Sequence, residues 1–264
     1  MKVSVIVATY ERPDFLERSL AGFLDQTRPP DELLVADDGS GQATADLVAD
    51  VARRASFPVH HVWQEDKGFR KTRILNRAAV RATGEYLILT DHDCIPGRRH
   101  VADHLRAARR GCFAVGKRIL LGPRGSEGFT GREGWGRILK LVFTGQINKP
   151  HLLVRCPPLV IRSRSLKGVR GCNFALFRED LERVNGWNED FEGYGREDSE
   201  LVVRLMRAGC VRRTPLHSCV VWHLYHDTSE RGELQKNDPL LEAAHTAPLF
   251  TPRGMRAETP SQSG

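Results

Sequence analysis

The chain has 264 residues, 40% of them hydrophobic, which is enough for one large α/β domain or two small ones. No apolar run approaches the roughly 20 residues of a membrane span, "VSVIVA" is too short for a signal peptide, and six scattered cysteines favour reduced thiols in a cytoplasm. The net charge of +7 is concentrated in the middle of the chain, which favours an anionic partner.

The first 110 residues alternate between two patterns. Four segments have the apolar, β-branched composition of buried strands: 3–10, 31–40, 59–64 and 86–90. Helical spacing predicts helices that begin at Pro13, at Gln42 and near Arg70, the last closed by Gly84. Strands that alternate with helices predict a parallel sheet with right-handed crossovers.

Polar residues stand at three of the predicted strand ends, namely Tyr10, the pair Asp37 and Asp38, and the pair Asp91 and Asp93. Ligands of open α/β sheets bind outside the carboxyl ends of the strands, so we expect these residues to line one crevice. Two carboxylates spaced as Asp-x-Asp suit Mg²⁺ or Mn²⁺, which keep positions free for phosphate oxygens. Such a cation would neutralise a diphosphate leaving group.

The middle of the chain is strongly basic, with 17 Lys and Arg against three acidic residues between Arg98 and Arg170. Within it, Trp135, Ile138, Leu139 and Val142 recur at helical spacing. One interpretation is a basic amphipathic helix on an anionic membrane surface; the other is a solvated basic face whose helix packs on its own domain. Nucleic-acid binding is disfavoured, because the basic segment lacks interleaved aromatic residues.

The last third contains two further clusters of reactive side chains. In "EGYGREDSELVVRLMRAG", Glu197 and Asp198 fall in the first turn of a predicted helix, behind a glycine loop. Acids at that position either stabilise the helix dipole or serve as a general base, and both interpretations stay open. In "VVWHLYHD", His223 and His226 follow a predicted strand. Either is a structural hydrogen-bonding residue or a nitrogen ligand that would favour Mn²⁺.

These segments resemble a known family. "VSVIVATYERPDFLERSLAGFLDQTRPPDELLVADDGS" resembles the opening of family-2 glycosyltransferases with the GT-A fold, and "GEYLILTDHDCIP" resembles their Asp-x-Asp strand. "GCNFALFREDLERVNGWNEDFEGYGREDSELVVRL" is similar to the C-terminal region of β-1,4-galactosyltransferases and related bacterial polysaccharide glycosyltransferases. The resemblance covers Val3 to Asp227. It implies a single GT-A domain: a Rossmann-like, mixed, mainly parallel sheet flanked by helices.

The resemblance also implies roles for individual residues. Asp198 matches the catalytic base, Glu197 the residue that holds the acceptor or donor sugar, and Asp93 and His223 the metal ligands. The remaining expected site residues form three groups: nucleotide-sugar binding by Thr9, Tyr10, Asp38, Arg70, Arg73 and Asp91; sugar contacts by Trp187, Tyr194, Gly195 and Asn173; and Asp37 and His226 as secondary candidates. Lys71 lies in the same basic segment as Arg70 and Arg73, where a cation would face the diphosphate.

We therefore expect an inverting, Mn²⁺- or Mg²⁺-dependent transferase that moves a hexose, with galactose or N-acetylgalactosamine favoured, from a UDP-sugar to a hydroxyl. The expected acceptor is a glycan or lipid-linked saccharide of cell-surface polysaccharide or lipopolysaccharide synthesis. The expected location is cytoplasmic, with peripheral contact to the inner membrane face. A retaining transferase and a nucleotidyltransferase are the alternatives; the latter is disfavoured because "ATYERPDF" lacks a glycine-rich phosphate loop.

Three regions are expected along the chain. Residues 1–110 would bind the nucleotide sugar, and residues 111–245 would form the acceptor-binding, catalytic half of the same domain. Residues 246–264, rich in Pro, Ser and Gly towards their end, are expected to be a disordered tail.

Overall fold

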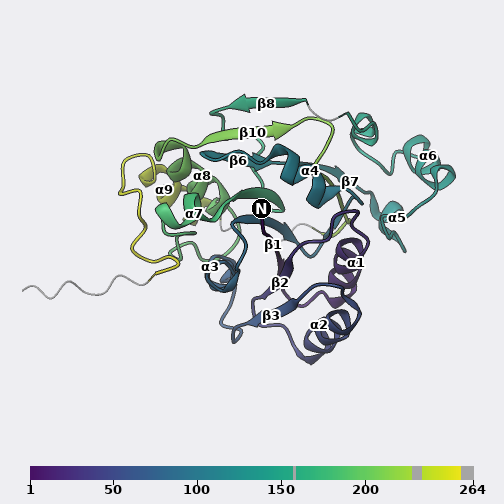
Figure 1. Cartoon of the computed structure of the whole chain (residues 1–264), viewed down its shortest axis with the longest axis horizontal. Helices are drawn as coiled ribbons and strands as arrows, with labels where there is room; N and C mark the ends of the chain where they lie inside the picture. The colour runs from purple at the N-terminus through teal and green to yellow at the C-terminus, as the bar shows by residue number, and fades with distance from the viewer. Residues whose placement is uncertain (157–158, 228–233, 257–264) are drawn as a thin grey trace, which may run out of the picture.

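The computed structural model of the protein describes residues 1–156, 159–227 and 234–256. Its described strands form an eight-stranded sheet and a three-stranded sheet, with helices packed around them (Figure 1). The large sheet has the strand order β3-β2-β1-β4-β9-β6-β10-β8. Among the helices that the structure describes, none combines the length and the apolar character needed to cross a bilayer.

The first half of the large sheet is parallel, as the alternating patterns predict. Its strands are β1 (Val3–Thr9), β2 (Glu32–Asp37), β3 (Val59–Trp63) and β4 (Tyr86–Asp91). The crossover helices are α1 (Pro13–Leu24), α2 (Gln42–Arg54) and α3 (Lys71–Arg81). In the register of β1 with its neighbours, Ala8 pairs with Asp91 and Thr9 with Asp37. The acids at the ends of β2 and β4 therefore lie along one edge of the sheet.

The second half makes the sheet mixed. Strand β9 (Asn173–Phe177) lies between β4 and β6 (Cys112–Val115) and runs antiparallel to both. Beyond β6 come β10 (Val211–Pro215) and the edge strand β8 (Val160–Ser163). The helices of this half are α7 (Arg178–Arg183), α8 (Glu197–Arg207) and α9 (Leu234–Ala243). Because Thr90 pairs with Asn173, β9 begins beside the end of β4.

A small sheet forms next to that edge, and the sequence patterns did not predict it as a separate unit. It joins β5 (Cys94–Pro96), β11 (Val220–His223) and β7 (Lys117–Leu120). Around it lie α4 (His100–Ala107), α5 (Pro123–Ser126), α6 (Trp135–Phe143) and the 3-10 helix η1 (Pro150–Leu153). In the β5–β11 register His223 pairs with Cys94, so a late histidine reaches the residue that follows Asp93.

The core is divided between the two faces of the large sheet. Side chains alternate along β1, with Val3, Val5 and Val7 packed beneath α1 and α2, and Ile6 on the opposite face with α3 and α8. The face with α8 also contains Trp187, which is among the largest fully buried side chains. The covered, continuous sheet agrees with one GT-A domain rather than two separate ones.

The beginning of the expected disordered tail is packed against the domain. The Asn185 side chain donates a hydrogen bond to the carbonyl oxygen of Thr251 at 2.7 Å, and its own oxygen accepts from the Arg256 backbone at 2.9 Å. Met255 contacts the core cluster. The composition of this segment did not predict that it packs on the domain. Its partner is the distant residue Asn185, which is buried and only 1% exposed. Residues 257–264 lie outside the described part of the chain.

Acid should destabilise the fold through His104, whose Nε2 contacts Asn173 Oδ1 at 2.9 Å in the core. Burial lowers the pKa of His104 from 6.5 to about 4, so the unfolded chain binds more protons between these values. Stability therefore falls as pH is lowered through this window, by up to about 3 kcal/mol from this group.

Urea unfolding at pH 7 and pH 4.5 checks this expectation. His104→Gln should lose about 2 kcal/mol less than the wild type over that interval, because glutamine does not titrate. His245→Gln, at an exposed position, should follow the wild type. Identical pH dependence in wild type and His104→Gln would contradict the assignment.

Candidate active site

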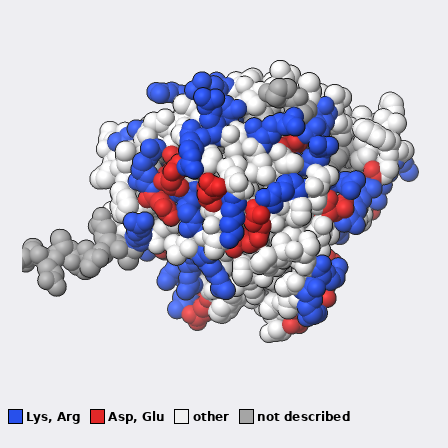
Figure 2. Space-filling model, in the orientation of Figure 1, with Lys and Arg blue, Asp and Glu red and all other residues white. Residues whose placement is uncertain are grey.

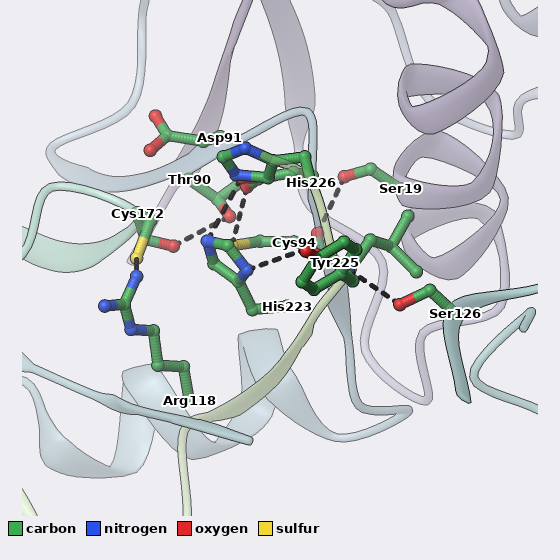
Figure 3. A network of polar contacts seen from close by, with 12 residues as sticks. Ser19, Thr90, Asp91, Cys94, Arg118, Ser126, Cys172, His223, Tyr225 and His226 are labelled. Atoms are coloured by element: carbon green, nitrogen blue, oxygen red, sulfur yellow. Dashed lines mark hydrogen bonds and ion pairs between the residues drawn. The ribbon is translucent and has the colours of Figure 1, made fainter. Parts of the chain in front are cut away.

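The turn between β4 and β5 brings Asp93 against two histidines from the end of β11. Asp93 Oδ2 lies 3.1 Å from His223 Nε2 and 2.9 Å from His226 Nε2. The two imidazole rings stack with centroids 5.3 Å apart, and Figure 3 shows both reaching the same point between the labelled Asp91 and Cys94. The Tyr225 backbone, between the histidines, donates to Ser126 Oγ at 2.7 Å and so holds the turn.

The hydrogen bonds at the far side of each ring limit what can lie between the three side chains. The Nδ1 atom of His223 contacts the Leu224 carbonyl oxygen and that of His226 contacts the Asp227 carbonyl oxygen, both at 2.9 Å. Only an N–H can make these contacts, so in neutral rings both Nε2 lone pairs face the carboxylate of Asp93. Lone pairs that face a carboxylate repel it, so a shared cation or an added proton has to lie between them. Backbone-held histidines of this kind are typical of metal ligands.

Charge effects on these groups agree with that geometry. Burial would raise the pKa of Asp93, but His223 and His226, which donate to its carboxylate once their rings are protonated, hold it well below its usual range. The contact with Asp93 in turn raises the pKa of His226. The donor set of one carboxylate and two imidazoles suits Mn²⁺, Zn²⁺ or a similar divalent cation. The three residues therefore fit a metal, and the structure favours both histidines rather than one.

Cys94 is a neighbour of this cluster that sequence reasoning missed. Its thiol donates to Asp93 Oδ1 at 3.1 Å, and donor atoms of Asp93, Cys94 and His223 lie within 4.8 Å of one another. Burial raises the pKa of the Cys94 thiol well above its usual range, which keeps it protonated. Its position directly after the Asp-x-Asp pair was the available signal, but chain adjacency alone does not show where a side chain points.

A second acidic cluster comes from the start of α8. The loop before it needs positive φ at Gly193, Gly195 and Arg196, and this turn brings Glu197 and Asp198 to the helix start. The Gly171 backbone, just ahead of β9, donates to Asp198 Oδ2 at 2.6 Å. A Cβ at position 171 would come within 2.4 Å of that carboxylate, so a larger residue there would displace the Asp198 side chain. Burial raises the pKa of Glu197 to about 7 and also raises the pKa of Asp198.

Lys71 links the two acidic clusters. Its Nζ lies 2.7 Å from Asp91 Oδ1, and Lys71, Asp91, Gly171, Trp187 and Asp198 line one small cavity. Burial would lower the pKa of Lys71, but Asp91 and then Asp198 and Glu197 raise it well above its usual range. A permanent cation therefore stands between the carboxylate of the Asp-x-Asp strand and the acids of α8.

The two arginines expected beside Lys71 have other surroundings. The Arg70 guanidinium donates to the carbonyl oxygen of Glu65, and Arg73 is exposed on α3. Their expected contact with a diphosphate stays a prediction. Spacing alone did not show which of the three basic residues faces the acids, because that depends on the angle at which α3 starts.

The residues expected at the nucleotide lie at the ends of β1 and β2. Asp38 donates its backbone N–H to the Thr9 carbonyl oxygen at 3.0 Å, and its carboxylate accepts from Gln64 at 2.5 Å and from the Arg70 backbone at 2.7 Å. Tyr10 is 45% exposed and donates to Asp66 at 3.0 Å.

Three of these polar side chains are buried, among them Asp38, which is 5% exposed. Thr9 is 4% exposed. Asp37 is fully buried and its carboxylate is engaged by Ser40 and His61, at 2.6 Å and 2.8 Å. Asp37 therefore stabilises the turn after β2, and its secondary role at the nucleotide stays a prediction.

Among the expected sugar contacts, the structure separates exposed from buried residues. Tyr194 is 46% exposed and Gly195 follows it in the loop before α8. Trp187 is only 2% exposed and backs the small cavity at Lys71. Asn173 is also 2% exposed, and its amide donates to the carbonyl oxygens of Lys117 and Cys219. Asn173 is thus a structural crosslink beneath the site, and its expected sugar contact stays a prediction.

Family models identify the chain's relatives. The model described as glycosyl transferase family 2 matches residues 4–168, which is more than half of the chain. The chain belongs to glycosyltransferase family 2. A second model, described as the N-terminal domain of galactosyltransferase, matches residues 151–227. Together they extend from β1 to the histidine cluster, and the resemblance drawn from the sequence is confirmed.

Similar proteins agree with the family. Validoxylamine A glucosyltransferase of Streptomyces hygroscopicus subsp. limoneus is 30% identical over 223 residues, which cover 78% of this chain and 48% of that protein. Chondroitin synthase of Pasteurella multocida (strain Pm70) is 25% identical over 247 residues, which cover 80% of this chain and 23% of that protein. The family-2 chain therefore spans about half the length of these relatives or less.

A solved structure supports the fold. GalNAc-T7 with UDP, GalNAc and Mn²⁺ superimposes with a TM-score of 0.63 at 18% identity, covering 86% of this family-2 chain and 44% of the other. The likeness, together with the sheet order described above, confirms the expected GT-A fold.

The Glu197 carboxyl should make stability fall as pH rises. Because its pKa is about 7 in the fold and 4.5 in the unfolded chain, the folded state binds more protons between these values. Its favourable contribution is complete below pH 4.5 and is lost as pH rises through 7. Glu197→Gln should therefore be more stable than wild type at pH 8, by about 1–3 kcal/mol, and equal at pH 4.5.

Chemical unfolding of the metal-free protein at both pH values measures this difference. Glu192→Gln, at an exposed position in the same loop region, is the matched control and should match wild type throughout. A Glu197→Gln protein that is no more stable at pH 8 would show that the carboxyl is not desolvated.

Proposed function

We propose that the chain is an inverting, metal-dependent glycosyltransferase that moves a hexose from a UDP-sugar to a hydroxyl of a saccharide acceptor. The observation that supports this most is the meeting of two clusters on one edge of the fold. Asp93, His223 and His226 form a cation-binding cluster, and Asp91 and Lys71 connect that edge to Asp198. Sugar transfer needs both parts: charge for a diphosphate leaving group and a base for the acceptor.

A divalent cation, Mn²⁺ or Mg²⁺, held by Asp93, His223 and His226 would supply the positive charge that stabilises the departing diphosphate. The lone pairs that converge on one point fit this role. A protein of similar structure supports this metal role, since the GalNAc-T7 structure contains Mn²⁺ and UDP. Thr9, Tyr10 and Asp38, near the ends of β1 and β2, would bind the nucleoside, with Asp91 at its ribose.

Asp198 is the proposed base. The Gly171 backbone orients its carboxylate, and the positive charge of the neighbouring Lys71 stabilises the ionised form of that carboxylate. In the proposed step the acceptor hydroxyl oxygen attacks the anomeric carbon while Asp198 takes the hydroxyl proton. The bond from that carbon to the UDP oxygen breaks and the electron pair leaves with UDP. No covalent enzyme intermediate is formed, so the anomeric configuration inverts.

Glu197 is assigned to holding a sugar hydroxyl, with Tyr194 and Gly195 in the adjacent loop. A carboxyl with a pKa of about 7 can accept or donate a hydrogen bond near neutral pH. Galactose or N-acetylgalactosamine is the favoured sugar through the galactosyltransferase-like segment, residues 151–227. Because one similar protein is a glucosyltransferase, glucose is the competing donor sugar.

The proposed acceptor is a glycan or a lipid-linked saccharide of cell-surface polysaccharide or lipopolysaccharide synthesis. Chondroitin synthase among the similar proteins supports a polysaccharide acceptor. The basic middle of the chain supports an acceptor with phosphate groups. We assign the protein to the cytoplasmic side of the membrane. A retaining transferase is the alternative, and the anomeric configuration of the product distinguishes the two.

Asp198→Asn should lower turnover by roughly 10² or more while leaving donor binding and folding intact, because only proton removal is lost. Single-turnover assays with the UDP-sugar and calorimetric UDP binding separate these effects. Asp46→Asn, an exposed substitution on α2, controls for charge. A fully active Asp198→Asn enzyme would refute the base assignment.

Mn²⁺ titrated into the donor-free protein by calorimetry should bind at least tenfold more weakly to Asp93→Ala, His223→Ala and His226→Ala than to wild type, because each removes one donor. His245→Ala should bind like wild type. A thermal-shift screen of nucleotide sugars with and without Mn²⁺ then identifies the donor. Activity that is indifferent to chelator would exclude the metal role.

A further inference from the structure

Helix α6 is apolar on two faces, and only one of them is covered. Six of its nine residues are apolar. Ile138 and Leu141 are buried in the cluster beneath the helix, with Ile119, Phe129 and Leu152. A helix that is apolar nearly all round normally has protein or lipid against both faces. The second face of α6 is therefore the unusual feature.

That second face consists of Trp135, Leu139 and Phe143, spaced at i, i+4 and i+8. The exposed fractions are 69%, 48% and 86%. The stripe expected from the sequence combined Trp135 and Leu139 with Ile138 and Val142, so the structure divides it between core and solvent. Over two turns these three side chains form a continuous apolar ridge about 12 Å long. We call it the α6 ridge.

The α6 ridge stands at the outside of the fold. In Figure 1 α6 lies at the upper right, away from the large sheet. In Figure 2 the corresponding lobe is largely white at its tip, with Lys and Arg around its base. The ridge therefore can meet a flat partner without obstruction from the body of the domain.

Basic residues surround the ridge. Lys140 is exposed on α6 itself, beside the ridge. Trp135 also lines a cavity of about 350 Å³ together with Arg98, Arg99 and Arg155, which come from outside the helix, and with the acids Asp103 and Glu133. Arg155 pairs with Asp103, and Arg98 pairs with Asp25. From position 117 to position 170 the chain has 12 Lys and Arg against two acidic residues. The segment that carries the ridge is thus net positive, although several of its arginines pair with acids.

We infer that the α6 ridge docks the protein on an anionic bilayer, with the helix parallel to the surface and Trp135, Leu139 and Phe143 in the interface. Interfacial helices combine an apolar ridge with Lys and Arg beside it, and aromatic side chains prefer the headgroup level. Each basic residue near an anionic surface adds to the attraction. This inference stands apart from the proposed reaction, because it uses none of its residues.

A second copy of the chain is a poorer occupant. Two ridges that face each other would bring two net-positive segments together, and like charges across an interface are unfavourable. A bilayer with anionic headgroups supplies the opposite charge and the apolar interior at once. The observations therefore favour lipid over self-association.

Vesicle sedimentation of the full chain tests the inference. Wild type should pellet with vesicles of phosphatidylcholine and phosphatidylglycerol, and much less with phosphatidylcholine alone or at high salt. The triple variant Trp135→Ser, Leu139→Ser, Phe143→Ser should partition at least tenfold less. Lys140→Glu should weaken binding to anionic vesicles by about fivefold. The exposed apolar substitutions Val80→Ser and Phe250→Ser serve as the matched control and should bind like wild type.

Tryptophan fluorescence locates the contact. Vesicles should shift the emission of wild type to the blue, and Trp135→Phe should keep binding while losing most of that shift. The variants change exposed side chains, so equal melting temperatures confirm that they fold. Absence of pelleting with anionic vesicles would overturn the inference, as would a triple variant that binds undiminished. A dimer that the triple variant dissociates, without lipid binding, would assign the ridge to self-association instead.

Discussion

The candidate site depends on one contact between parts of the chain that are 130 residues apart, namely that of Asp93 with His223 and His226. The contact exists because β11 pairs with β5 in a register that sets His223 opposite Cys94. A shift of that register by one residue would turn His223 away from the carboxylate. The small sheet, although only three strands wide, thus controls whether a cation-binding cluster exists.

The second constraint is electrostatic. Glu197 and Asp198 carry their carboxylates into a partly dehydrated edge of the fold, where burial opposes ionisation and raises their pKa values. The positive charge of Lys71 offsets the repulsion between the neighbouring carboxylates, and these acids in turn keep Lys71 charged. Burial destabilises the ionised carboxylates of Glu197 and Asp198. The same burial raises the pKa of Glu197 to about 7, so this carboxyl gains and loses its proton near neutral pH.

The sequence predicted the parts with long, regular patterns. The β-branched runs of β1, β2 and β4 and the helical spacing of α1 and α2 are strong local signals, and the structure has these elements close to the predicted bounds. The acids and histidines of the candidate site were recognised because acids stand at several predicted strand ends at once and because these segments resemble family motifs.

The other features of the fold and of the candidate site depend on tertiary contacts, which local sequence patterns do not predict. The strands β5, β7 and β8 have three or four residues each, too few for periodicity to distinguish them from loops. The burial of Asn173 and the selection of Lys71 over Arg70 and Arg73 follow from packing angles, which no local pattern encodes. The anchoring of residues 246–256 through Asn185 likewise depends on a partner far away in the chain.

The antiparallel strand β9 has a consequence for how such enzymes can be recombined. Because β9 lies between β4 and β6, a cut near residue 110 leaves an N-terminal fragment whose β4 keeps β1 but has lost β9 as a pairing partner. An open, apolar central strand of this kind invites aggregation. The same cut puts Lys71 and Asp91 on one fragment and Gly171 and Asp198 on the other, so the small cavity that these four residues line is divided. Chimeras that join the first part of one relative to the second part of another would have to take β4 and β9 from the same parent.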